Sequence, residues 1–411
     1  MKIVVIGAGL AGLSAADELH SAGVEVEVFE ASERVGGRVW SVPFAGLGMI
    51  ERGAEFVLPG ADALVGLADR FGLRLRPKGM PYGAREPRGG APTSVAELAA
   101  AVEGLKKDVT SYSSVEALLD AHRVPSAIAE ALRSRLAMSC GNTADDLSAD
   151  ELVTAGSEVD DYDARTIVGG NMRFAECLAG SLARPVNLSV PVRKIAQTDR
   201  GVVITTSCGD ISADAAVVAV PARVLQDIVF EPGLPAAKET RNLKYSHAAK
   251  LFVRLDESAV PSATQSVPGR FWCWTELDAD GEPRPILGAL AGTEEALAAL
   301  EIESGPEHWL DALERLRPDL KLDRKAVMLA TWRDQPWIRA VQVARSVSHP
   351  MNDEALGRPV GRLSFAGEHT AGPTWHGSME GAVRSGRRAA AEALAAARLA
   401  MTDPSLLIFR R

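Results

Sequence analysis

The sequence predicts an α/β fold with two domains, one of which is assembled from distant parts of the chain. Three observations support this prediction. A strand, a glycine loop, a helix and a second strand open the chain, and another strand–turn–helix unit closes it. At 411 residues the chain is also too long for one ordinary hydrophobic core. Because the two units lie at opposite ends, other segments must be inserted between their strands.

The opening unit runs from Ile3 to Glu30. An apolar run predicts a buried parallel strand, and a helix with apolar residues at helical spacing follows it. Gly7, Gly9 and Gly12 let the backbone turn tightly, approach a pyrophosphate and pack the helix closely against the sheet. The helix N-terminus presents free N–H groups to phosphates. Glu30 lies 18 residues past Gly12, where a carboxylate accepts hydrogen bonds from ribose hydroxyls. This order of features predicts a Rossmann-type dinucleotide site.

The segments that follow alternate between helical and strand patterns. Residues 61 to about 160 are mostly helical in pattern, interrupted by an expected loop at Arg85–Thr93. A glycine-led helix is expected from Gly169 to Leu182, followed by short strands and a buried strand, Asp214–Leu225, that ends at a proline. Residues 225–345 mix strands and helices.

This order predicts two interleaved domains. The nucleotide domain comprises residues 1–60, 161–224 and 346–400, and the second domain comprises residues 61–160 and 225–345, with a helical subdomain. Residues 401–411 form a C-terminal tail that is apolar and then basic. We expect this tail to pack on its own domain rather than on a membrane surface.

Composition excludes several classes of function. The net charge of −9 disfavours a nucleic-acid partner, because surfaces that bind nucleic acid are usually basic. No apolar run reaches the roughly 18 residues that a membrane span requires. The four cysteines are far apart and no histidine stands at metal-ligand spacing. We therefore expect no metal site, and reduced thiols in a cytoplasmic protein. The oligomeric state is left open, a homodimer included.

Three blocks of sequence carry a resemblance to a known family. They are IVVIGAGLAGLSAADEL with FEASERVGGR, then AAVVAVPARVL, and finally RLSFAGEHT with WHGSMEGAVRSGRRAA. In this order they resemble the flavin-containing amine oxidases, the monoamine and polyamine oxidase group. The resemblance implies an FAD-dependent oxidoreductase: a discontinuous Rossmann-type FAD-binding domain interleaved with a mixed-sheet plus helical substrate domain. A second glycine loop with its acid is missing, which argues against an enzyme that holds two nucleotides.

The resemblance also implies roles for residues in these blocks. Glu30 would hold the adenosine ribose, and Arg38 would offset phosphate charge near the flavin. Val192 would contact the adenine through its backbone, and Met379 would place its N–H at the flavin C2 carbonyl. The other residues expected at the cofactor are Gly7, Gly9, Leu10, Ala11, Gly12, Ala31, Arg34, Gly36, Gly37, Gly53, Ala54, Glu55, Phe56, Gly367, Glu368 and Ser378.

Lys250 is the predicted catalytic residue. In SHAAKLFVRL it matches the lysine that is hydrogen-bonded through water to flavin N5 in the family. Strand alternation places Ala248, Lys250 and Phe252 on one face. In that position Lys250 could handle protons or assist reoxidation by oxygen. The alternative is a lysine at a strand end whose head reaches solvent.

Some positions depart from the family pattern. Ser378 and Gln342 stand where the family places two aromatic rings beside the flavin. Trp337, Trp375 and His376 lie close by in sequence and are expected to supply replacement walls. His376 is either a base or hydrogen-bond donor, or a structural histidine. Where many members attach the flavin through a cysteine, this chain has Val341, so we expect non-covalent FAD.

The expected reaction is oxidation of a C–N bond in a primary or secondary amine, with oxygen as acceptor and hydrogen peroxide as product. Arg52 or Arg339 could anchor a carboxylate by bidentate pairing, which would make the substrate an amino acid. Rings in Phe271–Trp274 either line the substrate cavity or pack in the core. The alternatives are an L-amino-acid oxidase, a carbon–carbon desaturase, a flavin-binding regulatory protein and an NAD-binding protein without flavin.

Overall fold

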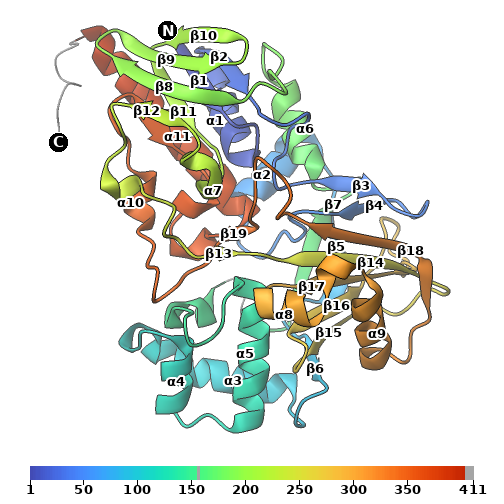
Figure 1. The fold of residues 1–411 in the computed structure, drawn as a ribbon. Helices are drawn as coiled ribbons and strands as arrows, with labels where there is room; N and C mark the ends of the chain where they lie inside the picture. The colour runs from blue at the N-terminus through green and yellow to red at the C-terminus, as the bar shows by residue number, and fades with distance from the viewer. Residues whose placement is uncertain (155–157, 403–411) are drawn as a thin grey trace.

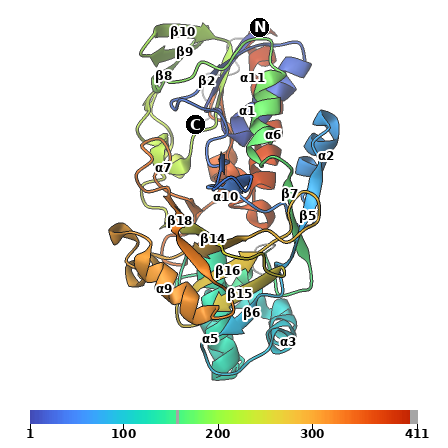
Figure 2. The same cartoon turned by 90° about the vertical axis from the view of Figure 1, so that its right-hand side faces the viewer.

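The computed structural model describes residues 1–154 and 158–402 and places both ends of the described chain in one half of the molecule (Figure 1). That half holds a parallel sheet covered by helices. The other half holds a larger sheet, with helices α3, α4 and α5 grouped at its far end (Figures 1 and 2).

Four parallel strands form the central sheet of the first half, in the order β2-β1-β11-β20. Their bounds are Lys2–Ile6 for β1, Glu25–Phe29 for β2, Ala215–Val218 for β11 and Leu363–Phe365 for β20. The sheet therefore joins strands from the beginning, the middle and the end of the chain. The predicted discontinuous sheet is confirmed.

Both faces of this sheet are buried, which explains the uninterrupted apolar run in β1. Ile3 and Val5 pack in a core with helices, whereas Val4 and Ile6 pack in a separate core with antiparallel strands. The elements that cover the sheet are α1 (Leu10–Ser21), α6 (Met172–Gly180) and α11 (Met379–Thr402) on one face, and β8 (Val192–Thr198), β9 (Gly201–Thr206), β10 (Gly209–Ala213) and β12 (Val229–Glu231) on the other.

The second half is built on a six-stranded sheet in the order β18-β14-β17-β16-β15-β6. Its neighbouring strands are antiparallel except for β15 and β6. The strands are β6 (Glu86–Arg88), β14 (Ala249–Leu255), β15 (Ser262–Ser266), β16 (Phe271–Thr275), β17 (Ile286–Ala291) and β18 (Leu322–Thr331). The helices of this half are α3 (Val95–Leu105), α4 (Val115–Ala121), α5 (Ser126–Cys140), α8 (Glu294–Ala299) and α9 (Glu307–Leu316).

Short elements connect the two halves. The strand pairs are β3 (Ser41–Pro43) with β4 (Met49–Glu51), β5 (Leu75–Pro81) with β7 (Asp163–Ile167), and β13 (Tyr245–Ser246) with β19 (Gln342–Val343). The remaining α-helices are α2 (Asp62–Phe71), α7 (Ala222–Leu225) and α10 (Asp353–Gly357). Short 3₁₀ turns cover Lys106–Ser111, Ala149–Val153, Ala236–Lys238, Ile302–Ser304, Glu368–Thr370 and Pro373–Trp375.

Two features of residues 61–160 differ from expectation. Strand β6 lies inside the expected loop Arg85–Thr93, and strand β5 interrupts the helical stretch. Both strands contain proline and lack regular apolar alternation, so periodicity could not reveal them. Helix α2 packs on α11 in the core of the first half, although this segment is expected in the second domain. The division into domains otherwise stays a prediction.

A carboxylate explains why α2 joins the first half. Glu380, in the first turn of α11, accepts hydrogen bonds from the backbone N–H groups of Ala63 and Leu64, each at 2.9 Å. These are free donors at the N-terminus of α2, so a side chain from the last helix caps it.

The FWCW segment packs in the core, and of its residues Trp274 also borders a small cavity of about 260 Å³. All side chains of the segment are buried; Trp272 and Trp274 pack in one cluster, and Phe271 and Cys273 pack in another on the opposite face of β16. The four cysteines are free. No helix in the described ranges is long and apolar enough to cross a membrane, and those ranges hold no cluster of three metal-ligating side chains. The expected packing of the C-terminal tail concerns residues that lie largely outside the described ranges.

Candidate active site

One cavity of about 370 Å³ brings together most of the predicted site residues. Its walls come from the loop between β1 and α1, the end of β2, strands β8 and β14, and the first turn of α11. Every predicted cofactor, catalytic or wall residue lines it except Gly12, Trp375 and His376. Segments from both halves of the molecule therefore form a single site.

The glycine loop forms the wall at the N-terminus of α1. Gly9 is the N-cap of this helix, and no side chain caps it, so its first N–H groups are available to a ligand. A Cβ added to Gly9 would meet nothing nearer than 4.0 Å. A Cβ at Gly12 would lie 1.9 Å from the Gly7 carbonyl oxygen. Gly12 thus does not line the cavity but allows the helix to approach the loop.

Glu30 is held at the end of β2 by three hydrogen bonds. Its carboxylate accepts from the Ala8 N–H at 2.7 Å, from the Ser32 N–H at 2.8 Å and from the Ser32 hydroxyl at 2.7 Å. The loop and the acid of the predicted dinucleotide site are therefore joined directly through Ala8. An uncapped helix end beside a fixed carboxylate fits the diphosphate and ribose of an adenine dinucleotide.

Arg38 and Glu368 form an ion pair in the cavity wall. Arg38 Nη1 donates to Glu368 Oε1 at 2.7 Å and to the Val341 carbonyl oxygen at 2.7 Å. Burial alone would raise the pKa of the Glu368 carboxyl, but Arg38 and two histidines, His376 and His369, together lower it. The Glu368 charge is therefore neutralised within the protein, which removes its repulsion toward a phosphate.

Lys250 is buried in the same wall, so the solvent-exposed alternative is wrong. Its Nζ donates to the carbonyl oxygens of Glu51 at 3.1 Å and Gly53 at 2.7 Å, and to Glu55 Oε2 at 2.5 Å. All three N–H donors of an ammonium are thus used by one short segment of chain, residues 51–55.

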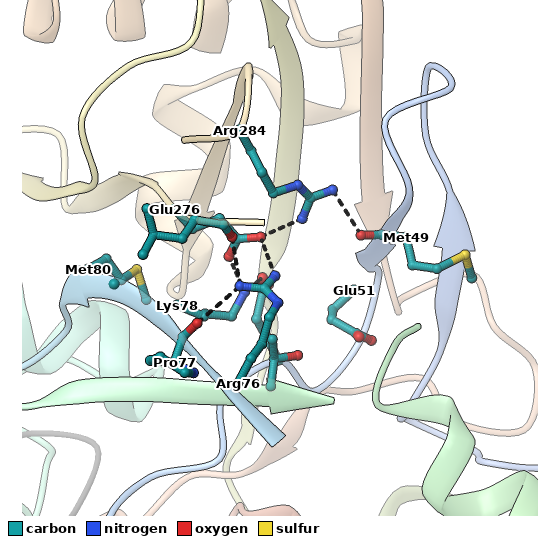
Figure 3. Close-up of polar contacts among 12 residues, drawn as sticks. Met49, Glu51, Arg76, Pro77, Lys78, Met80, Glu276 and Arg284 are labelled. Carbon is teal, nitrogen blue, oxygen red and sulfur yellow. Dashed lines mark hydrogen bonds and ion pairs between the residues drawn. The ribbon is translucent and has the colours of Figure 1, made fainter. Parts of the chain in front are cut away.

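A cluster of buried charges continues from Glu55 away from the cavity. Glu55 Oε1 accepts from Lys78 Nζ at 2.9 Å, and Lys78 also pairs with Glu276. Glu276 Oε1 accepts from Arg284 at 2.5 Å and from Arg76 at 3.4 Å. Figure 3 shows these basic side chains gathered around Glu276. The cluster borders a second cavity of about 260 Å³, which shares Glu55 with the first.

Glu51 is the other buried acid at this end. Burial raises the pKa of its carboxyl to about 7, although hydrogen bonds from Asn171 and Ser41 oppose the shift. The Asn171 N–H and the Ser41 hydroxyl donate to its two oxygens at 2.7 Å each. Glu51 is thus mostly a neutral acid below neutral pH. Its neighbour Glu55 contacts two lysines.

The predicted wall residues divide into two groups. Ser378, Gln342 and Trp337 line the cavity. Trp337, however, lies with its ring 5.3 Å from the Arg193 guanidinium, next to Val192. This is the end where the adenine is expected, so Trp337 is better placed to cover the nucleotide than a substrate.

Trp375 and His376, expected in the substrate wall, do not line this cavity. The Trp375 ring packs over Gly60, within about 3.5 Å of where a Cβ would stand, and beneath Arg384. His376 Nε2 contacts the Val343 carbonyl oxygen, and Nδ1 lies 3.9 Å from Glu368. Trp375 is the last residue of the 3₁₀ turn before α11 and His376 follows it, and both residues are half-buried.

Sequence reasoning missed two tryptophans, one of which lines the cavity. Trp332, at the end of β18, lines it and stands 6.2 Å from the Trp40 ring. The Arg52 guanidinium lies 4.0 Å from the Trp40 ring centroid and also lines the cavity. Trp40 stands three residues after Gly37, a residue expected at the cofactor, and this closeness in sequence was the available signal.

Comparison with known proteins decides the family. The model of the flavin containing amine oxidoreductases matches residues 10–152 and 104–394. The chain belongs to this family. It is therefore a flavin-dependent oxidoreductase, and the resemblance seen in its sequence is confirmed.

Individual relatives agree with the family assignment over nearly their whole length. AofH of Mycobacterium tuberculosis, whose name assigns it to the flavin-containing monoamine oxidases, is 28% identical over 96% of this chain and 97% of its own. An L-amino-acid oxidase of Pseudechis australis is 25% identical over 95% and 86%. The structure of a putrescine oxidase bound to putrescine superposes with a TM-score of 0.80 at 21% identity, covering 96% of this chain and 99% of that one. The predicted fold class is thereby confirmed.

Proposed function

We propose that this flavin amine oxidoreductase is an FAD-dependent oxidase of primary or secondary amines. The observation that carries the proposal is the burial of Lys250 in the wall of the cavity that also contains the glycine loop and the start of α11. When bound, FAD would supply the redox chemistry: acceptance of a hydride equivalent from the carbon next to nitrogen, with loss of a proton from nitrogen to leave an imine, and later transfer of two electrons to oxygen, which with two protons gives hydrogen peroxide.

The chain's own residues bind, orient and shield. The uncapped N-terminus of α1 would hold the diphosphate, and Glu30 would hold the adenosine ribose. Met379 opens α11 at the cavity, where its N–H and the positive end of the helix stabilise negative charge. Lys250 adds a second, fixed positive charge at the same cavity.

We further propose that the FAD is held without a covalent bond. Among the described residues that line the cavity there is no cysteine, and Val341 stands in the wall beside the Arg38 guanidinium. Precipitation of the holoprotein with acid should release all yellow colour to the supernatant. A yellow pellet after washing would contradict the proposal.

An L-amino-acid oxidase is the second candidate, and Arg52 favours it. Its guanidinium lines the cavity, and its Nε is buried with no hydrogen-bond partner among the described residues. An amino-acid carboxylate could pair with it. Arg339 is a poorer anchor, because it pairs with Asp227 at 2.7 Å and does not line the cavity.

An anaerobic substrate screen tests both candidates. Amines, diamines and L-amino acids are mixed with the oxidised holoprotein, and bleaching of the flavin absorbance identifies substrates; peroxide is then measured in air. Bleaching by simple amines supports the first proposal, and bleaching by amino acids alone supports the second. For the second, Arg52→Met should raise KM for an amino acid at least about tenfold, since a charged hydrogen bond is lost. Failure of every amine and amino acid, with bleaching by dithionite, would overturn both.

A further inference from the structure

We propose that Glu55 is a positioning residue for Lys250, and that Lys78, anchored by Glu276, in turn holds Glu55 in place. This inference rests on the proposed function, in which Lys250 acts at the flavin. It gives Glu55 a role different from direct contact with the cofactor. It also assigns a role to the buried charged residues that line the second cavity, namely to hold Glu55 in place.

The contacts of Lys250 identify Glu55 as its charge partner. Of the three groups that accept hydrogen bonds from its Nζ, two are backbone carbonyl oxygens, of Glu51 and Gly53. Glu55 Oε2, at 2.5 Å, is the single carboxylate that pairs with it in the described structure. An ammonium buried in a cavity wall needs such a partner, because desolvation disfavours its charged form.

Glu55 is shared between two lysines, one per oxygen. Oε2 faces Lys250, and Oε1 faces Lys78 Nζ at 2.9 Å. The side chain of Glu55 is 3% exposed and that of Lys78 is 2% exposed, so solvent screens neither contact appreciably. The carboxylate is therefore fixed from both sides, and it cannot turn away from Lys250 without leaving Lys78.

Lys78 is itself held in the charged form. Burial alone would lower the pKa of Lys78, but the carboxylates of Glu276 and Glu55 outweigh burial and raise it. Glu276 is held in turn by Arg284 and Arg76. Lys78 thus keeps a second carboxylate when Glu55 is removed, and Lys250 does not.

This asymmetry predicts what happens when the Glu55 charge is lost. Two buried ammonium groups would then lie on either side of a neutral side chain, and like charges favour loss of one proton. Lys250 is the more affected of the two by this loss of a partner, since the neighbouring acid Glu51 accepts its hydrogen bond only through a backbone oxygen and the Glu51 carboxyl is hydrogen-bonded to Ser41 and Asn171. Glu55 is therefore the carboxylate that offsets the charge of Lys250.

The variant E55Q tests the proposal on the holoprotein, with E55D as the conservative variant. The control is E314Q, which removes a carboxylate that pairs with Arg324 at 3.1 Å on the surface of α9. Each protein is reduced with dithionite, which needs no amine substrate, and then mixed with oxygen in a stopped-flow instrument between about pH 6 and pH 10. Flavin midpoint potentials and FAD dissociation constants are measured at the same pH values.

We expect E55Q to reoxidise at least about tenfold more slowly at the alkaline end, and to approach the wild-type rate at the acid end. Its midpoint potential should fall relative to wild type as pH rises, because the cation is lost. E55D should recover part of both properties, and E314Q should match wild type throughout.

Two results would overturn the proposal. One is a pH profile and potential of E55Q parallel to those of wild type. The other is a loss of FAD affinity beyond about threefold in E55Q, which would make Glu55 a cofactor ligand. If E55Q does not accumulate, E55D alone decides: wild-type behaviour at every pH excludes a role for the position of this carboxylate. All these measurements can be made and interpreted even if the amine screen fails, because dithionite reduces the flavin without a substrate.

Discussion

The two ends of the cavity are built in different ways. At the nucleotide end, the wall is formed mainly by backbone groups and glycines from residues 7–37. The side chain of Glu30 is held there by hydrogen bonds from Ala8 and Ser32, which belong to the same part of the chain. At the Lys250 end, side chains from four separate segments form the buried charge cluster. The first end depends on close approach of backbone, and the second depends on balanced charge. Mutations at the nucleotide end should therefore act through steric clashes. Mutations at the Lys250 end should change how stability and activity depend on pH.

The largest effect is expected at the nucleotide end. A Cβ at Gly12 would lie 1.9 Å from the Gly7 carbonyl oxygen, so Gly12→Ala must push α1 away from the loop. We expect loss of bound FAD, measured by the ratio of flavin to protein absorbance. The matched control is Gly66→Ala in α2, where nothing lies within 4 Å; it should keep FAD and change stability by no more than about 1 kcal/mol. A yellow Gly12→Ala protein would contradict the steric account.

The next effect concerns Glu51 at the other end. Its pKa of about 7 in the folded protein exceeds the ordinary 4.5, so the folded state holds a proton that the unfolded chain has released. The free energy of unfolding should therefore fall as pH rises from about 4.5 to about 7, by about 3 kcal/mol.

Glu51→Gln isolates this contribution because glutamine stays neutral: its oxygen can accept from the Asn171 N–H, and its NH2 group can donate to the Ser41 hydroxyl oxygen. Relative to wild type, the variant should gain about 3 kcal/mol between about pH 4.5 and pH 8. Thermal unfolding midpoints of both proteins across this range provide the check. Curves that remain parallel would show that Glu51 is ionised in the folded state.

The next effect, on turnover, is expected for Lys250→Met and is smaller than the stability change expected for Glu51→Gln. The side chain keeps its bulk and loses its charge, so FAD should stay bound while reoxidation slows by at least about tenfold, or about 1.4 kcal/mol. Lys325→Met, which removes an exposed lysine from β18, is the control. Equal stopped-flow rates for wild type and Lys250→Met would remove Lys250 from the mechanism.

The smallest effect is expected for Ser32→Ala. The change removes one of three hydrogen bonds to the Glu30 carboxylate and leaves the two from backbone N–H groups. FAD affinity should fall by about 1 kcal/mol, or about fivefold. Fluorescence titration of the apoprotein with FAD measures it, and a fall beyond about a hundredfold would mean that this hydroxyl, rather than the backbone, holds the acid.

The same contrast decides what could be predicted from sequence. Gly7, Gly9 and Glu30 lie within one strand–helix–strand unit, so their spacing alone places them at one site. The pair of Lys78 with Glu276 joins positions 198 residues apart, and no local pattern reports such a contact. Lys250 itself was predictable only because a family motif surrounds it.

Side-chain direction was the other limit. Trp375 and His376 are neighbours in sequence of cavity residues, but they lie in a segment with positive φ at Gly372 and Gly377 and do not line the cavity. Trp332 points into the cavity from the end of a strand whose register only the sheet defines. Sequence patterns place elements well, whereas the direction of a side chain in an irregular segment depends on backbone torsions that they do not encode.

The pairing of α1 with α11 has a consequence for synthesis of the protein on the ribosome. The first helix finds its main packing partner in the last one, across the whole length of the intervening chain. A nascent chain must therefore emerge almost completely before its first βα unit can bury its apolar face. Until then that unit is an exposed hydrophobic segment and a natural client for chaperones.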